Sequence, residues 1–330
     1  MTRIPLITSL SETFLGLVHN SFAKNDQDKN GKSSTRKPLR ASECTHYKKP
    51  RSMAVIITTY NNPRWLEKVL WGYSAQQFDT VPVKIVLADD GSQEATRDMI
   101  AAMRSKLSQE LIHVWHPDNG FQKTRILNRA IVAADADYLI FTDHDCIPRN
   151  DFLATHYQYA EPNYFLSGGY VKLPMNISEL LTPKDITSGR AFRVDWLRSQ
   201  GVSLRQNVLK LTANKTLATI LNWLTPTAAT WNGHGSSCWT TDALAINGYN
   251  EQMRYGGLDR EFGERLLNFG VKAKQVRHSV PVLHLDHSRP YVIPEAIEKN
   301  KAWRAEVRRS KKILSPLGIT EMLAEKNDNG

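Results

Sequence analysis

Between residues 53 and 142, short apolar runs alternate with longer segments that have helical periodicity. Four runs have the length and composition of buried strands, over residues 53–59, 83–88, 112–115 and 138–142. The segments 63–73, 94–107 and 122–134 lie between them and read as helices; the last sets its apolar residues along one face. Buried strands joined by helices predict an α/β fold with a mostly parallel central sheet covered on both faces.

Polar side chains follow three of these strands at the point where each strand ends. They are Thr58 to Asn62, Asp89 to Ser92, and Asp143 to Asp145. Because the carboxyl ends of parallel strands meet at one edge of a sheet, we expect these groups to lie together at the edge where ligands bind. Carboxylates gathered in this way are costly unless they bind a cation or a polar ligand. This edge is therefore the predicted functional site.

Asp143 and Asp145 are separated by a single residue, so both carboxylates can reach one divalent metal. Mg²⁺ and Mn²⁺ both prefer oxygen ligands. The alternative is a turn that the two acids cap. His284 and His287 follow another apolar run and are further metal candidates, although a lone histidine is more often a core residue. A hydrolytic zinc site would use the same atoms, but the sequence lacks the HExxH spacing of such sites.

Another acid stands at the start of a helix predicted over residues 260–269. Gly256 and Gly257 precede Asp259 and allow the backbone to approach a ligand closely. Asp259 is a candidate general base that would take a proton from a substrate hydroxyl. The alternative is that Asp259 only caps the helix.

The segment WNGHGSSCW, residues 231–239, combines small and hydrogen-bonding residues with two tryptophans. One interpretation is that a tryptophan stacks on a sugar ring. The other is a loop anchored by two core tryptophans, and the residues favour neither. We expect the substrate whose hydroxyl Asp259 would deprotonate, here called the acceptor, to contact residues 176–230 together with Trp231, Asn232, Gly233, His234 and Gly257.

In this order, the motifs resemble those of the family 2 glycosyltransferases with a GT-A fold. The similar segments are TTYNNP (58–63), LADDGS (87–92), HPDNGFQKTRILNRAI (116–131), TDHDCIP (142–148) and GGLDREFGERL (256–266). The family has Glu-Asp where this chain has Leu258 and Asp259, which leaves Asp259 as the match for the base. The second half is also similar to galactosyl- and N-acetylgalactosaminyltransferase domains, including those of chondroitin-type polymerases.

The resemblance implies a role for each matching residue. The fold would be Rossmann-like, with a smaller acceptor-side subregion. Thr58, Tyr60 and Asp90 would hold the uridine, and Arg125 and His144 would lie at the donor. Mn²⁺ or Mg²⁺ would be held by Asp143, Asp145, His287 and His284. Asp259 would be the base of an inverting transfer of Gal, GalNAc, Glc or GlcNAc from a UDP-sugar to a glycan or lipid-linked acceptor, in bacterial surface polysaccharide or lipopolysaccharide synthesis.

Two other classes of protein share parts of this pattern. A sugar-nucleotide-binding protein without activity would have had no reason to keep Asp143, Asp145 and Asp259. A nucleotidyltransferase would call for a glycine-rich phosphate loop after the first strand, where this chain has TTYNNPRW. Nucleic-acid binding would rest on basic termini alone, without a recognisable reading module.

The termini and the composition complete the expected organisation. We expect a basic, flexible leader over residues 1–52, a nucleotide-sugar-binding half over 53–175, an acceptor-binding and catalytic-base half over 176–290, and a basic helical tail over 291–330. Residues 1–51 hold ten Lys or Arg against four Asp or Glu, which suits peripheral contact with an anionic membrane. The three cysteines cannot all pair, and no apolar stretch is long enough to span a bilayer, so we expect a cytoplasmic protein.

Overall fold

The computed structural model describes residues 47–288 and 293–328. Most of the expected leader lies outside the described residues, so its structure stays a prediction. Within the described ranges, the longest helices are too short or too polar to cross a membrane. The elements predicted between residues 53 and 142 are all present, with ends that differ by a few residues.

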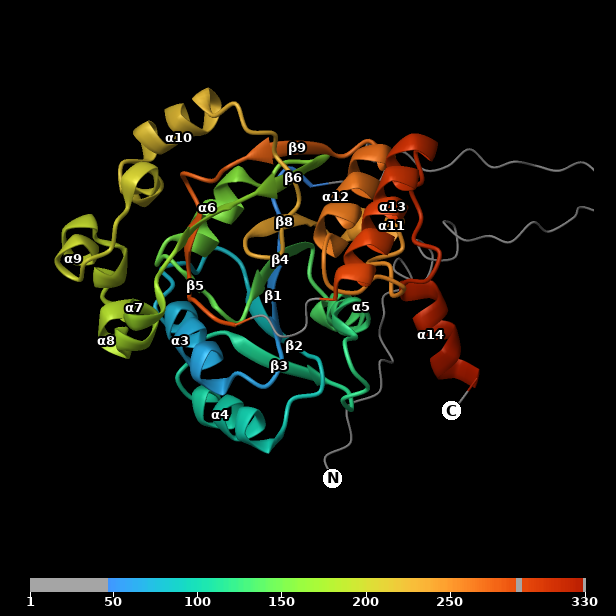
Figure 1. The fold of residues 1–330 in the computed structure, drawn as a ribbon, viewed down its shortest axis with the longest axis horizontal. Helices are drawn as coiled ribbons and strands as arrows, with labels where there is room; N and C mark the ends of the chain where they lie inside the picture. The colour runs from blue at the N-terminus through green and yellow to red at the C-terminus, as the bar shows by residue number, and fades with distance from the viewer. Residues whose placement is uncertain (1–46, 289–292, 329–330) are drawn as a thin grey trace, which may run out of the picture.

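A seven-stranded sheet forms the centre of the molecule (Figure 1). In spatial order its strands are β3 (Glu110–Trp115), β2 (Val83–Asp89), β1 (Met53–Thr59), β4 (Tyr138–Asp143), β8 (Ser236–Trp239), β6 (Tyr164–Ser167) and β9 (Lys272–Gln275). The first four are parallel, and β8 runs antiparallel to both β4 and β6. The predicted mostly parallel α/β sheet is therefore confirmed. Strand β8, from the second half of the chain, lies between two strands of the first half.

Alternate residues of the central strands face two separate hydrophobic cores. Val55 and Ile57 of β1 face the core covered by α3 (Pro63–Ser74) and α4 (Glu94–Arg104). Ala54 and Ile56 face the other core, which is covered by α5 (Lys123–Ala134) and α12 (Leu258–Phe269). Because both faces are covered, β1 is buried along its whole length, which explains its uninterrupted apolar sequence. Outside these helices, α13 (Pro294–Ser310) packs on α12, and α14 (Ile319–Asp328) packs on α5 (Figure 1).

Residues 164–172 form two strands that belong to different sheets. β6 belongs to the large sheet, whereas β7 (Gly169–Lys172) belongs to a three-stranded sheet with β5 (Cys146–Pro148) and β10 (Pro281–His284). The chain changes sheets at Gly168 and Gly169. A Cβ at Gly168 would collide with the carbonyl oxygen of Gly235, so only glycine permits this close crossing of two backbones.

The region from residue 175 to 224 is a series of short helices. These are α7 (Met175–Leu180), α8 (Pro183–Thr187), α9 (Val194–Ser199) and α10 (Lys215–Leu224), with 3₁₀ turns η1 (Arg190–Phe192) and η2 (Arg205–Leu211). They follow β7 and project to one side of the large sheet (Figure 1). The remaining described helices are α6 (Phe152–Tyr159) and α11 (Thr240–Ala245).

Candidate active site

The carboxyl ends of β1 and β4 bring Thr58 beside Asp143, because these residues are partners in the strand register. The Thr58 hydroxyl donates a hydrogen bond to Oδ1 of Asp143. Lys123, the first residue of α5, donates from Nζ to the same oxygen over 2.7 Å. Burial would raise the pKa of Asp143, but the Lys123 ammonium outweighs it and holds that pKa below its usual value. Asp143 is therefore ionised at neutral pH.

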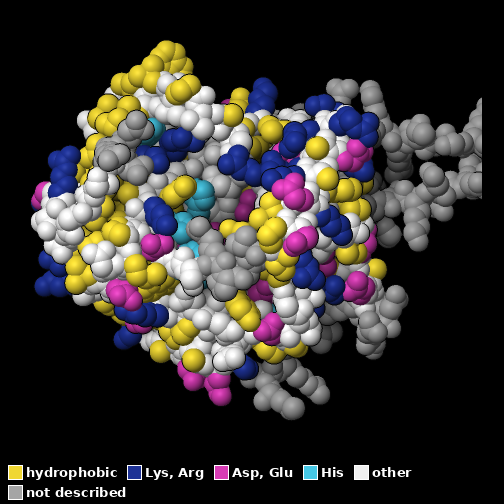
Figure 2. Space-filling view, viewed as in Figure 1, with side chains coloured by type: hydrophobic (Ala, Val, Ile, Leu, Met, Phe, Trp, Pro, Cys, Tyr) yellow, Lys and Arg dark blue, Asp and Glu magenta, His cyan; other side chains and the backbone are white. Residues whose placement is uncertain are grey.

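The small sheet brings His284 and His287 to Asp145. In that sheet β10 pairs with β5, which places His284 opposite Cys146. Nε2 of His287 lies 2.8 Å from Oδ2 of Asp145, and Nε2 of His284 lies 3.7 Å from the same atom. The two imidazole rings stack, with their centroids 5.7 Å apart. Histidine side chains are visible in the middle of this face of the molecule (Figure 2).

The hydrogen bonds of both histidines make this cluster suitable for a cation. Nδ1 of His284 lies 2.8 Å from the carbonyl oxygen of Leu285, and Nδ1 of His287 lies 2.7 Å from that of Ser288. A carbonyl oxygen only accepts, so each Nδ1 must carry the proton. Each Nε2 therefore faces the Asp145 carboxylate and, in a neutral ring, can offer its lone pair to a cation that the carboxylate also binds. This donor set fits Mn²⁺ or a similar divalent metal.

Asp145 also belongs to a second ligand cluster with Asp143 and Cys146. The Cys146 thiol donates to Oδ1 of Asp145, and burial raises the pKa of that thiol well above its usual value. Cys146 therefore stays protonated and is a poor metal ligand. Asp145 thus belongs to two groups of candidate ligands, one with His284 and His287 and the other with Asp143.

Asp259 and Asp143 both lie next to Gly233. A Cβ built on Gly233 would be 3.1 and 3.2 Å from the carboxylate oxygens of Asp259 and 3.3 Å from Oδ2 of Asp143. Oδ1 of Asp259 is buried and has no hydrogen-bond partner among the described residues. Burial of the carboxyl raises the pKa of Asp259 to about 6, against the lowering effect of Lys123. Gly257 occupies the cap position of α12, so Asp259 does not cap the helix.

The aspartates at the end of β2 have different partners. Asp89 is fully buried; it accepts from the backbone N–H of Ser92 and pairs with Nε2 of His113, each over 2.8 Å. Asp90 pairs with Nε2 of His116 over 2.7 Å and accepts from the backbone of Gln122 over 3.0 Å. Asp89 is thus a structural residue that fixes the turn after β2.

Tyr60 lies at the outer side of the same edge. Its ring is 47% exposed, and its hydroxyl donates to Oδ2 of Asp118 over 2.8 Å. That hydrogen bond raises the pKa of the Tyr60 hydroxyl, so the phenol stays neutral. An exposed aromatic face at the sheet edge is suited to stacking on a planar group.

Comparison with known proteins agrees with this geometry. The model of Glycosyl transferase family 2 matches residues 54–197. Residues 54–197 are therefore similar to a family 2 glycosyltransferase domain. The hyaluronan synthase of Pasteurella multocida is 31% identical over 96 residues, which are 29% of this chain and 10% of that protein. The poly(ribitol-phosphate) beta-N-acetylglucosaminyltransferase TarS of Staphylococcus aureus strain Mu50 is 27% identical over 92 residues, which are 28% of this chain and 16% of TarS.

Solved structures show that this glycosyltransferase domain has the GT-A fold. The crystal structure of S. aureus TarS 1-349 in complex with UDP-GlcNAc superposes with a TM-score of 0.52 and 15% sequence identity, covering 83% of this chain and 71% of that one. The chain spans only about a tenth to a sixth of the length of the curated relatives named above. The family match ends at residue 197, so β8, α12 and β10 of the candidate site lie beyond it.

The structure places Lys123, rather than Arg125, beside the carboxylates of the glycosyltransferase domain. Arg125 was expected at the donor, but its guanidinium pairs with Glu251 and Glu325. Residues two apart on a helix point in nearly opposite directions, so Lys123 and Arg125 cannot both face the sheet edge. Lys123 could have been recognised from its position as the first residue of α5, directly after the turn in the segment of residues 116–131 that resembles the family.

The loop of residues 231–239 is anchored by its two tryptophans. Trp231 is 1% exposed, packs against Phe141 and Phe262, and donates from its indole to the Tyr249 hydroxyl. It cannot offer its face to a sugar, so the acceptor-stacking interpretation of Trp231 is wrong. Trp239 is likewise buried.

The other residues expected at the acceptor are spread around the site. The backbone N–H of Asn232 donates to the Ser236 hydroxyl over 2.9 Å, and its side-chain Oδ1 is buried without a partner among the described residues. Gly257 faces α13, since an added Cβ would lie 3.1 Å from Cδ of Arg304.

His234 and Tyr170 form the aromatic side of the metal cluster. The His234 ring packs edge-on against Tyr170, with centroids 4.7 Å apart, and burial lowers the pKa of His234 to about 4. The Tyr170 ring is also 5.7 Å from that of His284 and is 41% exposed. Tyr170 was not expected from the sequence, because nothing indicated that β7 would run beside β10. His144 adjoins the same cluster, with its ring centroid 6.4 Å from that of His287 and its Nδ1 3.2 Å from the carbonyl oxygen of Thr58.

Proposed function

We propose that this chain is an inverting, metal-dependent glycosyltransferase that transfers a hexosyl group from a UDP-sugar to a glycan or lipid-linked acceptor. The observation that carries the proposal is the buried Oδ1 of Asp259, which has no hydrogen-bond partner among the described residues and lies, like Oδ2 of Asp143, next to the backbone of Gly233. A buried acid whose pKa is raised to about 6 is a suitable general base near neutral pH. The UDP-GlcNAc in the TarS structure supports a uridine nucleotide as donor.

Asp259 would accept the proton of the acceptor hydroxyl. The acceptor oxygen would form a bond to the anomeric carbon while the bond from that carbon to the diphosphate oxygen breaks, with the electron pair leaving on UDP. A single displacement of this kind inverts the anomeric configuration and needs no covalent intermediate. Tyr60 would lie against the uracil ring, and Thr58 and Asp90 would fix the turns on which the nucleoside rests.

Asp143, Asp145, His284 and His287 would hold the divalent metal. When bound, such a metal neutralises charge that develops on the leaving diphosphate. Lys123 adds a permanent positive charge beside Asp143, in the role first assigned to Arg125. His144 and His234 would close the site on the side of the metal cluster, with Tyr170 as the exposed aromatic surface toward the acceptor.

We assign the donor to residues 53–175 and the acceptor and base to residues 176–290. On this proposal the enzyme works at the cytoplasmic face of the membrane, where its basic termini make peripheral contact with anionic lipid. The product would be a bacterial surface polysaccharide or a lipopolysaccharide.

The test is release of UDP from a panel of UDP-Gal, UDP-GalNAc, UDP-Glc and UDP-GlcNAc with Mn²⁺. We expect turnover of one donor by the wild type and its loss in Asp143→Ala/Asp145→Ala. Glu298→Ala is the control, because that exposed acid pairs with Lys301 on α13, outside the regions assigned to the donor and the acceptor. UDP binding by calorimetry without turnover of any donor, even with a mixture of glycan acceptors, would instead identify a binding protein.

A further inference from the structure

Helix α10 is attached to the protein through Ala218 and polar residues and presents most of its large apolar residues outward. Leu217, Ile220, Trp223 and Leu224 are 40%, 47%, 83% and 59% exposed, whereas Ala218 and Asn222 are buried. An ordinary surface helix has the opposite arrangement, with its apolar stripe toward the core. Leu217, Ile220 and Leu224 recur at helical spacing, so they form one continuous stripe, with Trp223 beside it.

Specific hydrogen bonds hold the helix in this orientation. Asn222 donates to the Ser279 hydroxyl over 2.8 Å and accepts from the backbone N–H of His278 over 2.9 Å. Thr219 bonds to the Tyr159 hydroxyl over 2.8 Å. These bonds could not form if the helix were rotated to bury its leucines, so the outward direction of the apolar stripe is a property of the fold.

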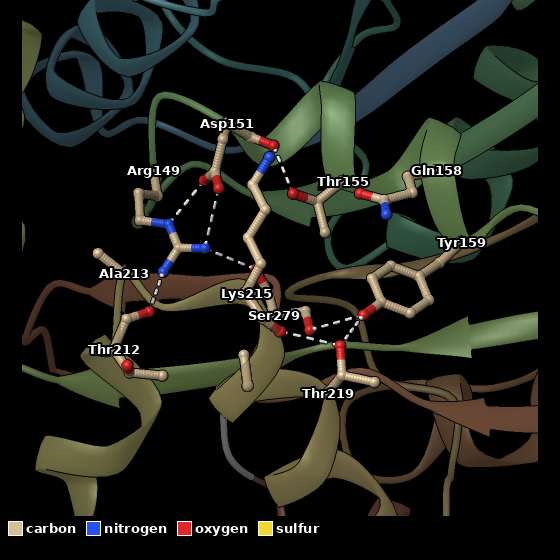
Figure 3. A pocket seen from close by; sticks show the side chains of 11 residues that line it. Arg149, Asp151, Thr155, Gln158, Tyr159, Thr212, Ala213, Lys215, Thr219 and Ser279 are labelled. Atoms are coloured by element: carbon tan, nitrogen blue, oxygen red, sulfur yellow. Dashed lines mark hydrogen bonds and ion pairs between the residues drawn. The ribbon is translucent and has the colours of Figure 1, made fainter.

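The space beneath the helix is small and polar. Figure 3 shows Arg149 bridging the segment before α10 to the segment before β10, with bonds to the carbonyl oxygens of Thr212 (3.1 Å) and Ser279 (2.8 Å). The cavity there is about 40 Å³, enough for little more than a water molecule. The hydrogen bonds of Arg149 therefore help to hold α10 in place, and the cavity is not a ligand site.

The surroundings of the stripe carry basic residues. Residues 208–230 contain Lys210 and Lys215 and no Asp or Glu. Residues 270–285, to which Asn222 is bonded, contain Lys272, Lys274 and Arg277 and again no acid. Lys274 is paired with Glu161. Figure 2 shows apolar side chains gathered at the top of the molecule, with Lys and Arg on the surface below them.

This combination fits an anionic bilayer better than a second copy of the chain. An interfacial helix places its apolar side chains among the lipid headgroups and acyl chains, with tryptophan at the boundary and basic residues against anionic lipid. A stable dimer buries about 20 to 30 residues on each side, far more than this ten-residue helix presents. The net charge of +10 for the whole chain points in the same direction.

We propose that α10 docks this protein on anionic membrane by inserting Ile220, Trp223 and Leu224 into the interface. This docking does not depend on glycosyl transfer. It is also separate from the basic leader, because the residues that carry it belong to the folded part of the chain. Through η2, whose Lys210 lies 5.4 Å over the Tyr170 ring, α10 is connected to the aromatic side of the candidate active site.

The experiment compares binding of the full chain to phosphatidylcholine vesicles with and without phosphatidylglycerol. The test variant is Ile220→Gln/Trp223→Gln/Leu224→Gln. The control variant is Leu180→Gln/Leu267→Gln/Leu314→Gln, which removes three leucines of similar exposure, 50%, 46% and 47%, from other parts of the surface. Thermal unfolding of both variants checks that the fold is intact.

We expect the test variant to bind anionic vesicles roughly tenfold more weakly than the wild type, and the control variant to bind like the wild type. Quenching of tryptophan fluorescence by brominated lipid should be seen in the wild type and lost in Trp223→Phe. Equal vesicle binding by the test variant and the wild type would overturn the proposal and leave the leader as the membrane contact. A dimer of the wild type that the test variant dissociates, without vesicle binding by either, would also overturn it and assign the face to a second copy.

Discussion

Asp259 has a raised pKa and a buried oxygen without a hydrogen-bond partner among the described residues, and these features have opposite consequences for activity and for stability. Its folded pKa of about 6 lies above the ordinary value of 3.8. The folded state therefore favours the protonated acid, and the stability contributed by protonation is lost as the pH rises through that window. An acid whose ionised, catalytically competent form lowers the stability of the folded state is typical of an active site.

We expect Asp259→Asn to lower kcat by roughly a hundredfold or more, because the amide cannot accept the proton of the acceptor hydroxyl. UDP affinity should stay within about twofold, since the base acts on the acceptor side. The melting temperature at pH 8 should be equal to or above that of the wild type, because the buried charge is gone. A variant that loses UDP binding together with activity would show that Asp259 serves the donor instead.

The same pKa predicts the pH dependence. The base must be ionised, so kcat/KM should fall about tenfold for each pH unit below about pH 6 and level off above it. Lys123, Asp143 and Arg260 are the charged groups that influence Asp259. Because Arg260 lowers the pKa of Asp259, Arg260→Gln should raise that pKa, and the fall in kcat/KM should then begin at a higher pH. A profile that is flat between pH 5 and 8 would argue against Asp259 as the base.

Gly233 is the residue whose missing side chain keeps Asp259 and Asp143 accessible to each other. Gly233→Ala should lower kcat/KM at least about tenfold, because the methyl group would lie against the oxygens of both acids. Gly235→Ala is the matched control, since its Cβ would meet nothing closer than the Gly168 Cα at 3.8 Å. If both variants were equally impaired, the effect would belong to the loop as a whole and not to the space between the acids.

Helix α5 is the element that separates the two cations near the site. It presents Lys123 to Asp143 and Arg125 to Glu251 and to Glu325 of α14. Lys123→Met should therefore lower kcat/KM at least about tenfold through the loss of positive charge beside the diphosphate. Arg125→Met should leave kcat/KM within about twofold and affect mainly thermal stability. Steady-state kinetics of both variants check this, and the reverse ranking would restore Arg125 to the donor.

Strand β10 is the element that completes the metal cluster, because it delivers His284 and His287 to Asp145. His284→Ala/His287→Ala should weaken Mn²⁺ binding at least about tenfold by calorimetry or electron paramagnetic resonance. His234→Ala is the control, since His234 lies next to the cluster but its ring packs on Tyr170. Unchanged Mn²⁺ affinity in the double variant would place the metal on the carboxylates alone.

The elements differ in how well the sequence predicted them, for physical reasons. Strands β1, β2 and β4 are buried on both faces, so their apolar runs mark them directly. The residues that follow them, from Thr58 to Asp145, could thus be placed at one edge. β7 and β10 are four-residue strands in a separate small sheet, and such lengths leave no periodicity to read. The position of Tyr170 depends on the pairing of β7 with β10, and the burial of Trp231 depends on Phe141 and Phe262, so both required the structure.

At the scale of the whole molecule, the two halves of the chain share one sheet. Strand β8 pairs with both β4 and β6, and β9 pairs with β6, so the second half supplies the strands that cover the edge of β4. The buried Glu261–Arg265 ion pair of α12 also bonds to the backbone of Ile246 and Gly248. The segment matched by the family model, residues 54–197, lacks β8, β9, β10 and α12.

We therefore expect a fragment of residues 47–197 to fail to fold as a unit. Without β8 the edge of β4 would expose unpaired backbone groups, and Phe141 would lose its contacts with Trp231 and Phe262. The fragment should show no cooperative thermal transition by circular dichroism and no binding of UDP with Mn²⁺. Residues 47–330 should melt in one transition whose midpoint rises with UDP and Mn²⁺, because a ligand held by both halves stabilises the entire unit. A cooperative melt of the fragment would mean that the donor half is an independent domain, and the site would then be assembled between two bodies rather than within one.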